Sequence, residues 1–117
     1  MARTYTHRER VLAALHHEEA DRIPFELGSS TATGITIAAY ENLARHCGVE
    51  PSIKVVDRMQ QLTAVDEAIL RSFDTDIRPV WLGTPDGWTD EEQPDGGYRD
   101  EWGVTRHKPE GSFYYRS

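Results

Sequence analysis

Four hydroxyl side chains follow directly on a short apolar segment, and they are the strongest candidates for a ligand-binding site in this sequence. Ser29, Ser30, Thr31 and Thr33 come after Ile23–Leu27, where apolar residues alternate with the period of a strand. In α/β proteins, ligands bind just beyond the carboxyl ends of strands. The pattern therefore predicts a small-molecule site at this loop. The same residue types also form helix caps and tight turns, and this alternative stays open.

A second apolar segment, Ile77–Leu82, also ends at a glycine, Gly83, and is followed by Thr84. If the two apolar segments are neighbouring strands, Thr84 lies beside the loop hydroxyls. We therefore include Thr84 in the predicted substrate-binding group.

Two groups have metal-ligating or nucleophilic side chains, and we favour a structural explanation for both. His16–Glu19 contains two histidines and two glutamates. Adjacent side chains on a helix point about 100° apart, so we expect a solvated helix end here and no metal site. Cys47 is the only cysteine and falls on an apolar helix face, which is typical of a small buried hydrophobic residue. No metal site is predicted within the chain.

Three charged residues could take part in catalysis or ligand binding. Asp100 and Glu101 are paired carboxylates, but on a strand they face opposite sides, so we favour a hairpin edge on which Trp102 packs. Arg78 could bind a carboxylate or a phosphate, although a surface arginine is the simpler interpretation.

Composition excludes several classes of function. The 117 residues have room for one domain, and the net charge of −7 disfavours a nucleic-acid partner. No apolar run approaches the length of about 20 residues that a membrane span needs. One cysteine cannot form a disulfide within the chain, which fits the reducing cytoplasm. We expect a cytoplasmic protein that binds neither membranes nor nucleic acids.

The elements that would position these residues alternate between helix and strand. Residues 1–82 are predicted as helix, strand, helix, helix and strand, and residues 83–117 as a loop and a β-hairpin. Thr6 and Glu9 form a capping box at the start of the first helix. The other predicted helices are Gly34–Cys47, followed by Gly48, and about Val56–Phe73.

This alternation predicts an α/β fold with a parallel sheet, and specifically the amino-terminal portion of a (β/α)₈ barrel with an inserted or terminal β-hairpin. The hairpin arms are predicted at Tyr98–Arg106 and Ser112–Arg116. A complete barrel needs about 250 residues. We therefore expect the chain to be the first part of a longer protein.

Several segments, in this order, resemble the uroporphyrinogen decarboxylase-like family. They are Thr6–Gly28, Ala32–Ile35, Val55–Leu62, Arg78–Gly83 and Asp100–Val104. The match resembles the corrinoid-linked methyltransferase-like and uncharacterised branch more than the enzyme of the porphyrin pathway. The resemblance implies a (β/α)₈ barrel with a pocket at the carboxyl ends of its strands.

Two chemistries share this family. The decarboxylase removes acetate carboxyl groups without a cofactor, using arginines and an aspartate near the first strands. The methyltransferases use zinc to activate a thiol and exchange a methyl group with a corrinoid. In this sequence the arginine-rich loop is replaced by Gly28–Gly34, and Val80–Gly83 lacks the aspartate.

The resemblance therefore implies a methyltransferase-like segment whose zinc ligands would lie beyond Ser117. Its partners would be a small-molecule methyl donor or a corrinoid protein. A uroporphyrinogen decarboxylase is the alternative. A third hypothesis is a non-enzymatic chain that assembles with a partner, or with itself, through open sheet edges.

Overall fold

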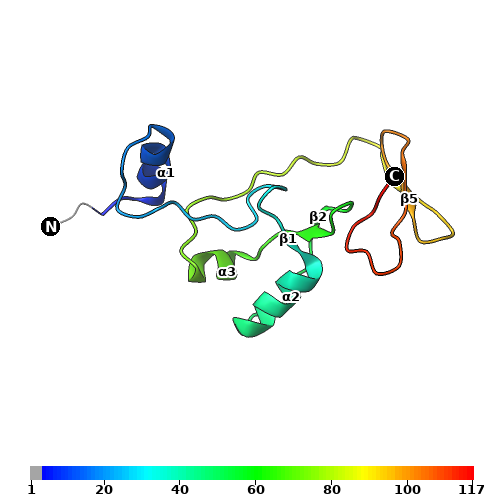
Figure 1. The fold of residues 1–117 in the computed structure, drawn as a ribbon, viewed down its shortest axis with the longest axis horizontal. Helices are drawn as coiled ribbons and strands as arrows, with labels where there is room; N and C mark the ends of the chain where they lie inside the picture. The colour runs from blue at the N-terminus through cyan, green and yellow to red at the C-terminus, as the bar shows by residue number, and fades with distance from the viewer. Residues whose placement is uncertain (1–3) are drawn as a thin grey trace.

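The computed structural model describes residues 4–117, which form three helices and two small antiparallel sheets (Figure 1). The helices are α1 (His7–Leu15), α2 (Ile37–His46) and α3 (Glu67–Ser72). In the first sheet the strand order is β1 (Ile35–Thr36), β3 (Leu62–Thr63) and β2 (Val55–Asp57). In the second sheet the order is β4 (Glu91–Glu92), β5 (Tyr98–Arg99) and β6 (Thr105–Arg106).

The prediction of an α/β barrel portion with a parallel sheet is wrong. Every strand pair among the described residues is antiparallel. Ile23–Leu27 and Ile77–Leu82 are extended but do not form strands. The first segment is held to the residue just before the second by a backbone hydrogen bond, from Asp76 N–H to the carbonyl of Phe25 at 2.7 Å. Each segment contains a proline, Pro24 or Pro79, which cannot donate to a ladder.

Helix α1 begins as predicted but does not pack as predicted. Thr6 is its N-cap, and the capping box with Glu9 is present. The helix ends at Leu15, and His16–Glu19 is exposed, which confirms the expected solvated end. The apolar face of the helix packs against little of the chain, as the 68% exposure of Leu15 shows. Arg10 and Ala13 are the buried residues of this helix.

The main apolar core lies between α2 and α3. Tyr40 and Ala44 from α2 and Ile69 from α3 are fully buried. Cys47 packs against them, as expected, but is only partly buried. Helix α2 is shorter than the predicted Gly34–Cys47, because Thr36 caps it and β1 precedes it. Gly48 follows its C-cap with a φ of 68°, the left-handed conformation that glycine adopts readily.

The predicted helix from about Val56 to Phe73 is also wrong. The segment forms β2, a tight turn, β3 and only the short α3. Asp57 accepts a hydrogen bond from Gln60 N–H at 2.8 Å, and Gln61 has a φ of 57°. A side chain that bonds to the backbone in this way stabilises a turn in place of a helix.

The predicted carboxyl-terminal hairpin folds back earlier than expected. The turn lies at Asp100–Val104, inside the predicted first arm, and joins β5 to β6. The predicted second arm pairs only through an isolated bridge between His107 and Arg116. Trp102 does not pack in the hairpin, because it is 76% exposed.

The chain is elongated, with α1 at one end and the second sheet at the other (Figure 1). Its radius of gyration is 17.8 Å, whereas a compact domain of this length has about 13 Å. A long segment without helix or strand, residues 73–90, runs between α3 and β4. None of the helices within residues 4–117 has the length and apolar character of a membrane span.

Candidate functional site

The residues that were predicted to form one substrate-binding site lie in two separate places in the structure. Ser30 and Thr33 lie within hydrogen-bond distance of each other, 3.0 Å between their hydroxyl oxygens. Thr33 also accepts a backbone hydrogen bond from Gly28 at 3.0 Å, so this loop, with Ser29 and Thr31, closes on itself. The cap of α2 is Thr36, outside the predicted group.

Thr84, in contrast, lines a cavity of about 440 Å³ where the first sheet meets the second. We call it the junction cavity. Its walls come from the β2 strand and following turn, from residue 84, and from the second sheet with its turn. They comprise Val55–Met59, Thr84, Asp90, Tyr98, Asp100–Trp102 and Arg106. Ser29, Ser30, Thr31 and Thr33 are not among the lining residues.

Arg58 joins the two sides of the junction cavity. Its guanidinium donates to both carboxylate oxygens of Glu92, at 2.7 and 2.9 Å, and to Asp90 at 3.1 Å. The same group lies over the Tyr98 ring, 4.0 Å from its centroid, in a cation–π contact. Hydrogen bonding to Glu92 is the largest cause that raises the pKa of Arg58, and burial opposes it.

Asp100 shapes the opposite wall. Its carboxylate accepts hydrogen bonds from the backbone of Trp102 and Val104, at 3.1 and 2.9 Å, and from Arg106 at 2.9 Å. Burial raises the pKa of Asp100, but these hydrogen bonds outweigh burial and leave the pKa below its usual value. Asp100 is therefore an ionised turn-former, which presents Glu101 and Trp102 to solvent.

The junction cavity carries an excess of negative charge. Four carboxylates line it, against two guanidiniums, a formal net charge of −2. Both guanidiniums are engaged, Arg58 with Asp90 and Glu92, and Arg106 with Asp100. The arrangement suits a neutral or positively charged ligand better than an anion.

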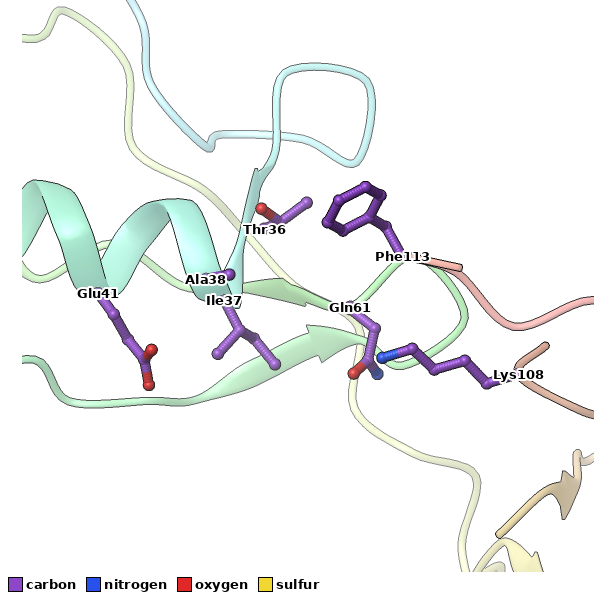
Figure 2. A pocket seen from close by; sticks show the side chains of 7 residues that line it. All are labelled: Thr36, Ile37, Ala38, Glu41, Gln61, Lys108 and Phe113. Carbon is purple, nitrogen blue, oxygen red and sulfur yellow. The ribbon is translucent and has the colours of Figure 1, made fainter. Parts of the chain in front are cut away.

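A smaller cavity of about 210 Å³ lies at the start of α2 (Figure 2). The ammonium group of Lys108 points toward the side-chain amide of Gln61, and Phe113 lies beside Thr36 (Figure 2). Glu41 from α2 also lines it. An acidic and a basic side chain on one small, open surface give no clear preference for a ligand charge.

No protein-family model, curated protein or solved structure matches this chain. Among residues 4–117, no group of three or more histidine, cysteine, aspartate or glutamate side chains could hold a metal ion.

The sequence patterns did not identify most residues of the junction cavity as candidate site residues. Asp57 and Arg58 lie in a segment expected to be helical, and Asp100 was assigned to a hairpin edge. One signal did point here. Two of the segments that carry the family resemblance, Val55–Leu62 and Asp100–Val104, both line this cavity, and a third, Arg78–Gly83, ends next to Thr84.

A second charged group, centred on Asp76, fixes α1 to the rest of the chain. The Asp76 side chain is fully buried and accepts hydrogen bonds from Arg10, Arg22 and Phe25 N–H, at 2.5, 2.6 and 2.8 Å. Arg10 also makes a bidentate pair with Asp21. Each arginine is held by carboxylates, so the group stabilises structure and leaves no cation free to bind a ligand.

Acid is expected to detach α1 from the rest of the chain. Burial raises the pKa of Asp76, but hydrogen bonds from Phe25 N–H, His7, Arg22 and Arg10 outweigh it and place the pKa well below its usual value. Asp76 therefore stabilises the folded state above its unfolded-state pKa of about 4, and this stabilisation is lost as the pH falls below that value. The protection factors of the α1 amides, in which the exchange rate is corrected for its intrinsic pH dependence, should therefore fall between about pH 5 and about pH 2. Protection factors that stay constant over this range would contradict this role of Asp76.

Proposed function

We propose that the junction cavity binds the small methyl donor of a corrinoid-linked methyl transfer, in a protein of the uroporphyrinogen decarboxylase-like type. One observation carries this proposal. Segments that resemble the family, far apart in the sequence, meet at one cavity with a net acidic lining. Thr84, which was predicted to bind substrate, is part of that lining.

Size and charge both favour methyl transfer over the alternative, decarboxylation of uroporphyrinogen. A volume of about 440 Å³ lies in the lower part of the range for small-molecule sites, about 300–1,000 Å³. Uroporphyrinogen is a macrocycle with many carboxylates, which needs guanidinium partners. Arg58 and Arg106 already pair with carboxylates of this chain. A small uncharged or cationic donor avoids both conflicts.

The cofactors that the resemblance implies are zinc and a corrinoid. The described residues do not fit zinc, because a catalytic zinc needs about three protein ligands and residues 4–117 bring no such group together. We therefore assign no step of the reaction to zinc in this chain. The corrinoid would be presented by a partner protein, with the junction cavity holding the donor.

Binding experiments on the chain distinguish the two chemistries. Backbone amide shifts of Asp100–Val104 are followed while a panel of methyl ethers, methyl thioethers and methylated amines is added, and separately while uroporphyrin is added. At least one small donor should give saturable shifts, and uroporphyrin should give none. Shifts with uroporphyrin alone, or decarboxylation of uroporphyrinogen by the chain, would establish the alternative function.

The exposed apolar segments favour a second candidate, self-association. Ile23, Val80 and Leu82 are 87%, 94% and 98% exposed. They lie on the two extended segments, whose backbones make few hydrogen bonds to the rest of the chain. A second copy would cover Ile23, Val80 and Leu82 and pair with the free backbone edges of these segments.

Replacing Val80 and Leu82 with aspartate should therefore weaken any association at least about tenfold, because burial of each side chain contributes about 1.5–3 kcal/mol. Sedimentation equilibrium over a range of concentrations measures this. Leu15→Asp is the matched control, because Leu15 is also exposed but lies on α1. A wild-type chain that stays monomeric at every concentration would exclude this candidate.

A further inference from the structure

The charge and wall chemistry of the junction cavity narrow its ligand to one chemical class. We infer that the cavity recognises an organic cation, an ammonium group that carries an apolar body. The inference rests on the proposed role of this cavity as a small-molecule site, but it does not depend on methyl transfer. The cavity offers such a ligand uncompensated negative charge and an open aromatic face, and other ligand classes fit it less well.

The uncompensated negative charge comes mainly from two carboxylates. Within residues 4–117, Asp57 receives hydrogen bonds only from neutral donors, the backbone and side-chain N–H groups of Gln60, at 2.8 and 2.9 Å. Glu101 is exposed at the turn, and no ion pair involves it in the part of the chain described. Asp90 shares one guanidinium with Glu92. A cation in the cavity would therefore gain attraction without first breaking an ion pair.

The apolar walls supply a surface for the body of such a ligand. Trp102 lines the cavity, and its side chain is largely open to solvent. Val55 and Met59 are large apolar residues that line the same cavity and are also exposed. An indole face attracts an alkylammonium group more strongly than other aromatic side chains do. Tyr98, in the same cavity, already holds a cation of this chain, the Arg58 guanidinium.

Other ligand classes fit less well. An anion would meet a net negative lining whose guanidiniums are already paired. A metal ion would need three converging ligands, which are absent from residues 4–117. A neutral apolar molecule would use Trp102, Val55 and Met59 but would leave the carboxylates without a partner. The organic cation is the class that uses both features of the cavity.

Three isosteric probes test this inference on the intact chain. Choline is the cation. In 3,3-dimethyl-1-butanol (dimethylbutanol), carbon replaces the ammonium nitrogen of choline. The anion of similar shape is 3,3-dimethylbutanoate, the ion of tert-butylacetic acid (tert-butylacetate). Each is titrated while the indole N–H signals of the three tryptophans are followed by NMR, with Trp102 assigned from Trp102→Phe. Choline should shift the Trp102 signal saturably, about tenfold more tightly than dimethylbutanol, and tert-butylacetate should not bind.

Two variants and a control locate the binding. Trp102→Ala and Glu101→Gln should each weaken choline binding about fivefold, measured from the backbone amide shifts of the Asp100–Val104 turn, because Trp102→Ala has no Trp102 indole signal. Both positions are exposed, so the fold should survive. Glu110→Gln, at an exposed position outside the cavity lining, should have no effect. Added salt should weaken choline binding, as expected for an attraction between charges.

The outcomes separate this inference from the proposed function. Equal affinity for choline and dimethylbutanol, or preference for tert-butylacetate, would overturn the cation assignment and leave a small-molecule site in place. Binding of magnesium or zinc ions with a larger Trp102 shift than choline would likewise overturn it. If no probe moves the Trp102 signal, the inference fails, and the donor panel described above decides the proposed function independently.

Discussion

Replacing Asp76 with asparagine should free α1 from the rest of the molecule, the largest structural effect that we expect from one substitution. The carboxylate is fully buried between Arg10 and Arg22, and its loss leaves two guanidiniums with less compensating charge. Breaking a buried ion pair by removing one partner costs about 3 kcal/mol. Because α1 has few other buried contacts, the loss should appear locally as faster hydrogen exchange at its amides.

The second sheet provides the internal reference for this experiment. It lies at the opposite end of the chain (Figure 1), so exchange of its amides should not change in Asp76→Asn. Asp74→Asn is the matched control, because Asp74 also pairs with Arg22 but is mostly exposed. An equal acceleration in both variants, or uniform acceleration along the chain, would show that Asp76 is not a local anchor for α1.

Replacing Arg58 with alanine should separate the second sheet from the β2–β3 turn and remove the junction cavity. Arg58 donates hydrogen bonds to Glu92 and Asp90, and its guanidinium lies over the Tyr98 ring. Tyr115 packs edge-on against Tyr98. The N–H of Tyr115 also donates to the carbonyl of Met59, the residue after Arg58. A partly desolvated cation–π contact alone contributes about 2 kcal/mol. The tyrosine signals in near-ultraviolet circular dichroism should fall, and saturable shifts at Trp102 should disappear.

Arg58→Lys separates charge from geometry. Lysine keeps the positive charge but cannot donate two parallel hydrogen bonds to Glu92. Its behaviour should therefore lie between those of the wild type and Arg58→Ala. If Arg58→Ala keeps both the tyrosine signal and the Trp102 shifts, the cavity does not depend on this residue, and our account of how its walls are held would be wrong.

Local signals in the sequence predicted local structure well. The capping box of Thr6 and Glu9 and the glycine after α2 are confirmed, because each depends on residues at most a few positions apart. The exposed end at His16–Glu19 follows from the same kind of signal. The position of Cys47 against the core is also confirmed.

Helical periodicity gave a wrong prediction where a turn competed with the helix. Met59, Leu62, Val65, Ile69 and Phe73 have helical spacing, but only Ile69 lies within α3. Leu62 is instead a buried residue of β3, so its apolar character correctly indicated burial, whereas its spacing wrongly indicated a helix. The side chain of Asp57 stabilises the competing turn by accepting a hydrogen bond from Gln60 N–H, three residues later. The prediction gave more weight to the helical spacing of the apolar residues than to this local turn signal.

The interactions that build the candidate site and those that anchor α1 could not be read from the sequence, because they join distant residues. Arg58 meets Glu92 across 34 positions, and Arg22 meets Asp76 across 54. Nothing in the spacing of these charges specifies such pairs. The ordered segments that resemble a family contained the cavity residues without showing that they converge.

We propose that the junction cavity, and not the Ser29–Thr33 loop, is where this chain holds a small organic ligand. Intermolecular nuclear Overhauser effects from the choline methyl protons test it most directly. We predict contacts to the Trp102 indole and to the Met59 methyl group, which line the cavity together. Contacts to the side chains of Ser29–Thr33, with none to Trp102, would contradict the claim.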